Sequence, residues 1–290
     1  MQKVLYYKSM SDLYLYDGEY GKRGYLKENF RIFNINDKSD KQFEFHYHEF
    51  NKIVFFISGN AKYIIEGKEY KLNPFDVLLV PKGDIHKPVI DENINYNRII
   101  MWIDSKFLNR FDNLDTCFSL AKSNRSYLIK TNPAKVFDLV LELSKCNEND
   151  FGYELLINAL FVQIMVHINQ NILSQNEVQI DYKCNKQIDS VIDYINNHLF
   201  DSLSVDSIAK EFFISRYYLM HKFKEATGKP LLSYIKTKRL LAAAALLTDG
   251  ESAKTACFKV GFKDYSVFLK AFKNEFDLTP TEYKKIYSAL

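Results

Sequence analysis

The chain has 290 residues, of which 47% are hydrophobic and 26% charged, and its net charge is +3. These values are typical of a globular protein with about two domains. The charge is unevenly distributed. Residues 185–290 contain 16 Lys and Arg against 12 Asp and Glu, whereas the other residues contain 23 against 24. We expect the basic excess in the C-terminal third to suit a polyanionic partner.

Export, membrane insertion and a disulfide framework are not expected. Residues 1–8 contain no apolar run long enough for a signal peptide. The most apolar stretch, 155–168, is about 14 residues long, whereas a membrane span needs about 20. The four cysteines are scattered without the spacing of metal ligands, so we expect reduced thiols in a cytoplasmic protein. They are Cys117, Cys146, Cys184 and Cys257.

Residues 1–105 have the pattern of short β-strands separated by turns. Apolar runs of three to five residues occur at 53–57, 63–65, 77–80 and 99–103, and Gly or Pro follows several of them. Short strands at roughly ten-residue spacing predict a β-sandwich or barrel. We assign residues 1–132 to this barrel.

Three histidines of this region have a recognisable spacing. His46 and His48 are two residues apart, which places both on one face of a strand, and His86 follows Pro81-Lys-Gly83. Over residues 45–90 the chain resembles a cupin, a small jelly-roll barrel. The cupin pattern implies a metal site of three His and one Glu, but Lys52 stands at the position of the Glu. Phe75 and Ile90 also replace a Gly and an Asn of the pattern.

An ammonium group in place of a carboxylate repels a divalent cation, so we predict no bound metal and no cofactor. We predict that the barrel is a sensor whose pocket binds a small-molecule effector. Its candidate lining residues are His46, His48, Phe55, Tyr63, His86 and Trp102. Two alternatives stay open: the histidines are satisfied by the fold alone, or three His suffice to bind zinc.

The periodicity then changes to that of helices. Pro133 is well placed to begin a helix with one apolar face, and a second helix over 153–173 is apolar on more than one face. We assign 133–174 to a helical dimerisation segment of a homodimer, and packing on the barrel itself is the alternative. Residues 175–186 are polar and non-periodic, which indicates a linker.

The C-terminal domain, 187–290, contains the same unit twice. Residues 205–223 and 252–272 each predict a short helix, a tight turn and a longer amphipathic helix, which is a helix-turn-helix. Gly261 lies in the second turn, where a positive φ costs Gly little. Phe213 stands at the equivalent place in the first turn, where a positive φ would be strained. A helix rich in Ala and Leu over 230–247 would hold the two units rigidly, about 34 Å or one DNA turn apart.

From about residue 186 to 285 the chain resembles the DNA-binding domain of the AraC/XylS family of transcription regulators. The residues that carry the resemblance are Ile208, Ala209, Tyr218, Leu219, Phe223, Lys224, Thr227, Gly228, Arg239, Leu240, Ala243, Leu246, Leu247, Val260, Gly261, Phe262, Phe268, Phe272, Lys273, Thr279, Pro280 and Tyr283. Two units and their spacer match together. The chain departs from the pattern at His221, Lys222, Ala253, Ala256 and Asp277.

The resemblance implies an α+β protein: a cupin-like β-barrel (jelly roll) with a helical segment, then an all-α domain with two helix-turn-helix units. It implies base contacts from Arg216, Tyr217, Met220, His221, Tyr265, Ser266, Leu269 and Lys270. Lys222, Lys224, Lys263 and Lys273 are better placed for phosphates. The predicted partners are double-stranded promoter DNA, a small-molecule effector and RNA polymerase.

We therefore predict a sequence-specific transcription regulator that is not an enzyme and responds to a small-molecule effector. The resemblance implies a sugar as a common effector for regulators with this kind of barrel. The sign of regulation is open. Two rival hypotheses are a metal-dependent cupin enzyme that has acquired DNA-binding helices, and an effector-independent regulator whose barrel only dimerises.

Overall fold

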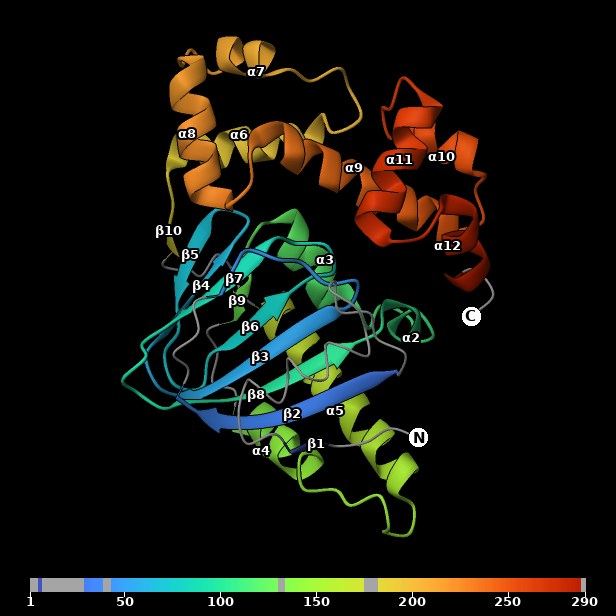
Figure 1. Ribbon diagram of the computed structural model, residues 1–290. Helices are drawn as coiled ribbons and strands as arrows, with labels where there is room; N and C mark the ends of the chain where they lie inside the picture. The colour runs from blue at the N-terminus through green and yellow to red at the C-terminus, as the bar shows by residue number, and fades with distance from the viewer. Residues whose placement is uncertain (1–4, 7–28, 39–42, 130–133, 175–181, 288–290) are drawn as a thin grey trace. The chain divides into compact units, whose positions relative to one another are not determined.

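The computed structural model describes residues 5–6, 29–38, 43–129, 134–174 and 182–287 (Figure 1). The chain forms two compact units, Met1–Lys183 and Cys184–Leu290. The first unit is built on two β-sheets with helices packed against them. The second unit is entirely helical. The α+β fold class predicted from the sequence is confirmed.

The first unit has a six-stranded sheet and a four-stranded sheet. The order in the first is β1 (Leu5–Tyr6), β2 (Phe30–Asp37), β8 (Tyr96–Ile103), β3 (Asn51–Ser58), β6 (Val77–Val80) and β9 (Leu128–Ile129). The order in the second is β10 (Tyr182–Lys183), β5 (Lys68–Lys71), β4 (Ala61–Ile65) and β7 (His86–Ile90). The four apolar runs singled out in the sequence lie in β3, β4, β6 and β8.

The six-stranded sheet is covered on both faces. Its outer face packs against α4 (Ala134–Leu143) and α5 (Tyr153–Ser174), where Phe30 stacks on Phe161 with ring centroids 4.6 Å apart. Its inner face looks into the barrel. Side chains alternate between the two faces of a sheet, and in β3 and β8 both faces are covered. Nearly every side chain of these two strands is therefore buried, which explains their almost continuous apolar sequences.

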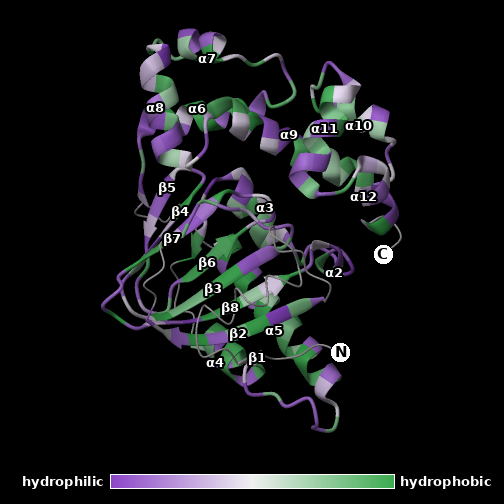
Figure 2. Ribbon diagram, in the orientation of Figure 1, coloured by the Kyte–Doolittle hydropathy of each residue, from purple (hydrophilic) through white to green (hydrophobic). Residues whose placement is uncertain are grey.

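Helix α5 has two apolar faces, and Figure 2 shows it hydrophobic over most of its length. At 22 residues it is long and apolar enough to cross a membrane by length and composition, so the 14-residue length argument from the sequence is wrong. A core helix passes the same test, and one face of α5 is buried in the core of the barrel unit. The buried Asn169 of α5 accepts from the backbone N–H of Cys117 (2.7 Å) and donates to the carbonyl of Leu114 (2.9 Å).

Several elements of the first unit were not predicted. Helices α2 (Ser105–Leu108) and α3 (Thr116–Ser123) follow the last long strand, within the region assigned only as barrel. Asp104 caps α2 by accepting from the backbone N–H groups of Lys106 and Phe107. The end of the predicted linker is also ordered, because Tyr182 and Lys183 pair with β5 as β10. Residues 175–181 of that linker lie outside the described residues.

The second unit contains seven helices among its described residues. They are α6 (Lys186–Asn197), α7 (Val205–Glu211), α8 (Arg216–Thr227), α9 (Leu231–Thr248), α10 (Ala253–Lys259), α11 (Tyr265–Phe276) and α12 (Pro280–Tyr287). Side-chain oxygens of Ser204, Ser215, Ser252 and Asp264 cap the N-termini of α7, α8, α10 and α11. The two predicted helix-turn-helix units are α7–α8 and α10–α11, and α9 is the predicted connecting helix.

The turns of the two units end their first helices in the same way. The backbone N–H of Ile214 donates to Ala209 (3.0 Å), and that of Phe262 donates to Cys257 (3.1 Å). These six-to-one bonds define a Schellman motif, which needs a left-handed residue just before the donor. That residue is Phe213 (φ 53°) in the first turn and Gly261 (φ 83°) in the second. Phe213 is 95% exposed, so no local packing offsets its strained backbone.

Candidate DNA-binding surface and barrel interior

Helices α8 and α11 carry matching stripes of side chains, all of them exposed except the half-buried Tyr265 and Leu269. On α8 the stripe is Arg216, Tyr217, Met220, His221 and Lys224, and on α11 it is Tyr265, Ser266, Leu269, Lys270 and Lys273. Each set follows the spacing i, i+1, i+4, i+5 and i+8, which is one face of a helix. The opposite face of each helix is buried through Leu219 and Phe223 on α8 and through Phe268 and Phe272 on α11. The fold therefore presents ten of the twelve predicted DNA-binding residues in two equivalent rows.

The two other predicted contacts lie off these rows. Lys222 is on another side of α8, and its Nζ lies 2.8 Å from the carboxylate of Glu225. Lys263 precedes α11 and is exposed in a turn one residue longer than the first. Arg216 is on the stripe but donates to the exposed Asp206 of α7 at 3.1 Å. An exposed pair of this kind is weak and exchanges readily for a phosphate or base edge.

Arg239 on α9 links the two helix-turn-helix units within the C-terminal domain, and the sequence did not predict this role. Its guanidinium donates to the carbonyls of Leu199 (2.8 Å), Asp201 (2.5 Å) and Gly261 (3.0 Å). These contacts join the loop before α7, the connecting helix and the turn of the second unit. Arg239 was noted in the sequence only as part of the family pattern, because its acceptors are backbone carbonyls 22–40 residues away.

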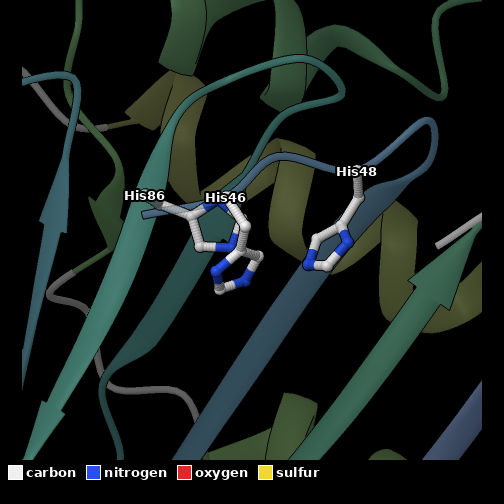
Figure 3. A group of neighbouring side chains, drawn as sticks. All are labelled: His46, His48 and His86. Carbon is white, nitrogen blue, oxygen red and sulfur yellow. The ribbon is translucent and has the colours of Figure 1, made fainter. Parts of the chain in front are cut away.

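The three predicted histidines of the barrel converge, as Figure 3 shows. His46 and His86 form a backbone bridge, and their ring centroids are 4.4 Å apart. The ring of His48 lies 4.9 Å from that of His46 and 5.1 Å from that of His86. The expected strand around His46 is only this isolated bridge. The bridge nevertheless brings the segment before β3 to β7 and so gathers the three rings.

Backbone carbonyls fix the proton positions of two of these rings. Nδ1 of His46 donates to the carbonyl of Glu44 (2.8 Å), and Nδ1 of His86 donates to that of Asp84 (2.9 Å). Because a carbonyl only accepts, Nε2 of each ring is an acceptor while the imidazole is neutral. Burial, and then the charge of Lys52, lowers the pKa of His46 to about 4.

The other two imidazoles are also neutral at pH 7. Burial holds the pKa of His48 and of His86 well below the ordinary range, and the charges of His46 and Lys52 lower both further. Nδ1 of His48 and Nε2 of His86 are buried and have no hydrogen-bond partner within the described part of the chain. The cluster therefore consists of neutral imidazoles, and two of their ring nitrogens have no hydrogen-bond partner among the described residues.

Lys52 and Trp102 lie on the same inner face as the histidines. They are directly opposite each other on β3 and β8, and Trp102 is also opposite Arg31 on β2. The Trp102 ring lies 6.2 Å from the ring of His48. Nζ of Lys52 lies 5.7 Å from the centre of the Tyr63 ring, across the barrel on β4. The predicted lining residues Tyr63 and Trp102 thus face the histidine cluster.

The prediction for Phe55 is wrong. Phe55 is three residues after Lys52 on β3, so strand alternation turns it to the outer face. There it meets Phe137 of α4, with ring centroids 5.9 Å apart. Its apolar character therefore reflects core packing under the helices.

Both domains of the chain are similar to domains of known proteins. A helix-turn-helix domain model matches residues 208–286, and a cupin domain model matches residues 37–96. The HTH-type transcriptional activator RhaR of Mannheimia succiniciproducens is 24% identical over 257 residues, which are 83% of this chain and 87% of that protein. The lactose operon transcription activator of Staphylococcus xylosus is 25% identical over 250 residues, which are 84% of this chain and 88% of that protein.

The chain is an AraC-family transcription regulator. A solved AraC-type regulator from Chromobacterium violaceum has 25% identity, covers 36% of this chain and 93% of its own, and superposes with a TM-score of 0.34. The cupin-like N-terminal domain and the AraC-type DNA-binding domain predicted from the sequence are both confirmed.

This AraC-family chain departs from the four-ligand metal site of cupins. The three histidines offer ligand atoms that all lie within 4.8 Å of one another, which suits a metal ion. The fourth position is held by Lys52, whose charge reaches all three rings. Glu49 does not replace the missing carboxylate, because it pairs with Lys82 at 3.2 Å. The residues therefore do not fit the four-ligand site.

Proposed function

We propose that this regulator recognises a two-block promoter site by inserting α8 and α11 into successive major grooves. The observation that carries the proposal is the pair of matching exposed stripes on the two helices. Base contacts come from Arg216, Tyr217, Met220 and His221 in one groove and from Tyr265, Ser266, Leu269 and Lys270 in the other. Phosphate contacts, which carry no sequence information, come from Lys224 and Lys273 on the stripes, from Lys263 before α11, and from Lys222 once it leaves its exposed pair with Glu225.

Selection of bound sequences from a random duplex library with the full-length protein tests this proposal. We expect enrichment of two conserved blocks about one helical turn apart. Affinity for the selected site should fall with salt, but its preference over unrelated DNA should persist. Binding without sequence preference would contradict the proposal and leave only electrostatic attraction.

Two substitutions locate the recognition helices. Arg216→Ala and Lys270→Ala should each weaken binding to the selected site by about 1–3 kcal/mol and relax the preference within one block only. Lys285→Ala removes an exposed charge from α12, off both stripes, and is the matched control. Electrophoretic mobility shifts on block-mutated duplexes measure the effect. Variants that bind like the control would show that the stripes are misassigned.

We propose that the barrel, residues 1–132, binds a small-molecule effector among His46, His48, His86, Tyr63 and Trp102. The neutral imidazoles and the buried indole provide the few converging polar groups that are usual in ligand sites. The effector alters regulation only if it binds the DNA-competent state with a different affinity from the other state. The Staphylococcus xylosus relative is a lactose operon transcription activator, which supports a sugar-like effector and activation of transcription. We propose that activation proceeds through contact with RNA polymerase.

We further propose that this protein is a regulator and not a cupin enzyme. The relatives that match over most of the chain are named as transcription activators, and Lys52 opposes the metal on which a cupin enzyme would depend. We also propose a cytoplasmic protein without membrane contact. Its parts are the barrel, a helical segment at 133–174, a linker at 175–186 and the DNA-binding domain at 187–290.

The helical segment is proposed to form a homodimer through the exposed face of α5. Leu155, Val166 and Leu173 are 80%, 39% and 64% exposed. They belong to two series with seven-residue spacing on one side of α5: Leu155 and Val162, and Ala159, Val166 and Leu173. Large apolar side chains at such intervals are typical of a helix pair. The opposite face of α5 already packs into the barrel core, so both alternatives left open by the sequence are compatible with this helix.

Light scattering tests the dimer. Leu155→Glu combined with Val166→Glu should shift the full-length protein from dimer to monomer, because it places charges in an apolar seam. Phe151→Glu changes a fully exposed residue in the loop before α5 and is the matched control. An unchanged mass for the double variant would exclude this face of α5 as the interface.

A further inference from the structure

We propose that the barrel interior binds a polyhydroxylated anion, a sugar-like compound that carries a carboxylate or a phosphate group. This inference rests on the proposed function, since it names the chemical class of the effector at the same site. The site is defined here by the three histidines, Lys52 and Trp102. Each of these residues has been placed on the inner face of the barrel by strand pairing or by ring contacts.

The first argument is the placement of cationic side chains on that inner face. Arg31, Trp102 and Lys52 form a row across β2, β8 and β3, in which each cation is directly opposite the indole. Arg98 lies four residues before Trp102 on β8 and therefore faces the same way. All three cations are buried. A ligand anion in this low-dielectric interior would be attracted far more strongly than in water.

The second argument is the set of polar atoms that await a partner. Nε2 of His86 and Nε1 of Trp102 belong to side chains that are 0% and 3% exposed, and neither atom has a partner among the described residues. The imidazole nitrogen accepts a hydrogen bond, and the indole N–H donates one. Unmet buried atoms of both kinds are costly, and hydroxyl groups satisfy both because a hydroxyl donates and accepts.

The third argument is the apolar surface beside these atoms. Phe50 lies 4.6 Å from the Trp102 ring and stacks on the His48 ring at 4.6 Å. Such rings suit the C–H face of a sugar. A purely apolar compound would leave the polar atoms unmet, and a divalent cation would face Lys52. A compound with hydroxyls, a C–H face and one negative group meets all three features.

Fluorescence titration of the full-length protein tests the proposal, since Trp102 is the single tryptophan of the chain. The probes are D-gluconate, D-glucose 6-phosphate and the neutral polyol D-glucitol. The variants are Lys52→Met, Lys52→Arg and, as the matched control, Lys71→Met at an exposed position of β5. The emission maximum of Trp102 reports whether each variant has kept its folded barrel.

We expect at least one anion to bind ten times more tightly than glucitol. Lys52→Met should weaken that anion at least tenfold and leave glucitol within twofold, whereas Lys52→Arg and Lys71→Met should retain the preference. Tighter binding of gluconate or of glucose 6-phosphate distinguishes a carboxylate from a phosphate.

Three results would overturn the proposal. Equal binding of glucitol and both anions, unchanged by Lys52→Met, would remove the anionic class and leave a neutral effector. No response to any probe would remove the polyhydroxylated class. Stoichiometric zinc in the purified protein, lost in His86→Gln, would assign the cluster to a metal. None of these measurements involves DNA, so the DNA-binding function stands or fails separately in the library selection.

Discussion

Gly261→Ala should destabilise the DNA-binding unit through two separable effects. An alanine there would keep a φ of 83°, and the left-handed region costs a non-glycine residue roughly 1–2 kcal/mol. Its Cβ would also lie 2.6 Å from the carbonyl oxygen of Phe200 and 3.1 Å from Cζ of Arg239. Relief of the contact with Arg239 must move the guanidinium away from its carbonyl acceptors. The loss of one hydrogen bond from a charged donor costs roughly 1.5–3 kcal/mol.

The sum is about 2.5–5 kcal/mol, which lowers the midpoint of a domain of this size by roughly 10–40 °C. Thermal unfolding of the full-length protein should be followed by circular dichroism and by Trp102 fluorescence together. The first reports helices, and the second reports only the barrel. Gly250→Ala is the matched control, because Gly250 has a φ of 99° but no heavy atom within 4 Å of its Cβ position. Equal losses in Gly261→Ala and Gly250→Ala, or a shift in the Trp102 transition, would refute the reasoning.

Two further predictions concern the turn of the first unit and the barrel interior. Phe213→Gly should stabilise the DNA-binding unit by about 0.5–1 kcal/mol, because it removes a left-handed bulky residue whose ring is exposed; a lower midpoint in circular dichroism would contradict this. The barrel should lose stability as the pH falls below about 6.5. The buried imidazoles have a lower pKa in the folded state than in the unfolded chain, so below this pH the unfolded chain binds more protons and is favoured. With a pKa of about 4, His46 alone contributes a loss of about 2 kcal/mol at pH 5. Urea unfolding followed by Trp102 fluorescence at pH 7 and pH 5 measures the loss. His46→Gln should reduce it and His167→Gln on α5 should not, and equal losses in both variants would exclude His46 as its source.

Several features of the site could be predicted from local sequence. The two helix-turn-helix units were predictable because capping residues, small residues at the helix crossing and apolar spacing all lie within about twenty residues of one another. The exposed stripes on α8 and α11 follow from helical periodicity alone. The proximity of His46 and His48 follows from their two-residue separation.

Other features depended on which segments meet in three dimensions. Phe55 looked like a pocket residue, and only the register of β3 against β8 and the helix beyond it placed the ring on the outer face. The short helices α2 and α3 lack the length that makes helical periodicity visible. The helix over 153–173 was predicted almost to the residue, but only the structure shows that the polar Asn169 is buried in it, where its side chain meets the backbone of Leu114 and Cys117.

The sequence by itself determined the family, the two-domain organisation and the positions of the two helix-turn-helix units, because periodicity and short-range spacing encode them. The tertiary structure decided the chemistry of the barrel interior. Arg31, Lys52 and Trp102 are far apart in the chain and become neighbours only through strand pairing. The link from Arg239 to three distant carbonyls is likewise a property of the folded chain, since backbone acceptors leave no mark on the residues that supply them.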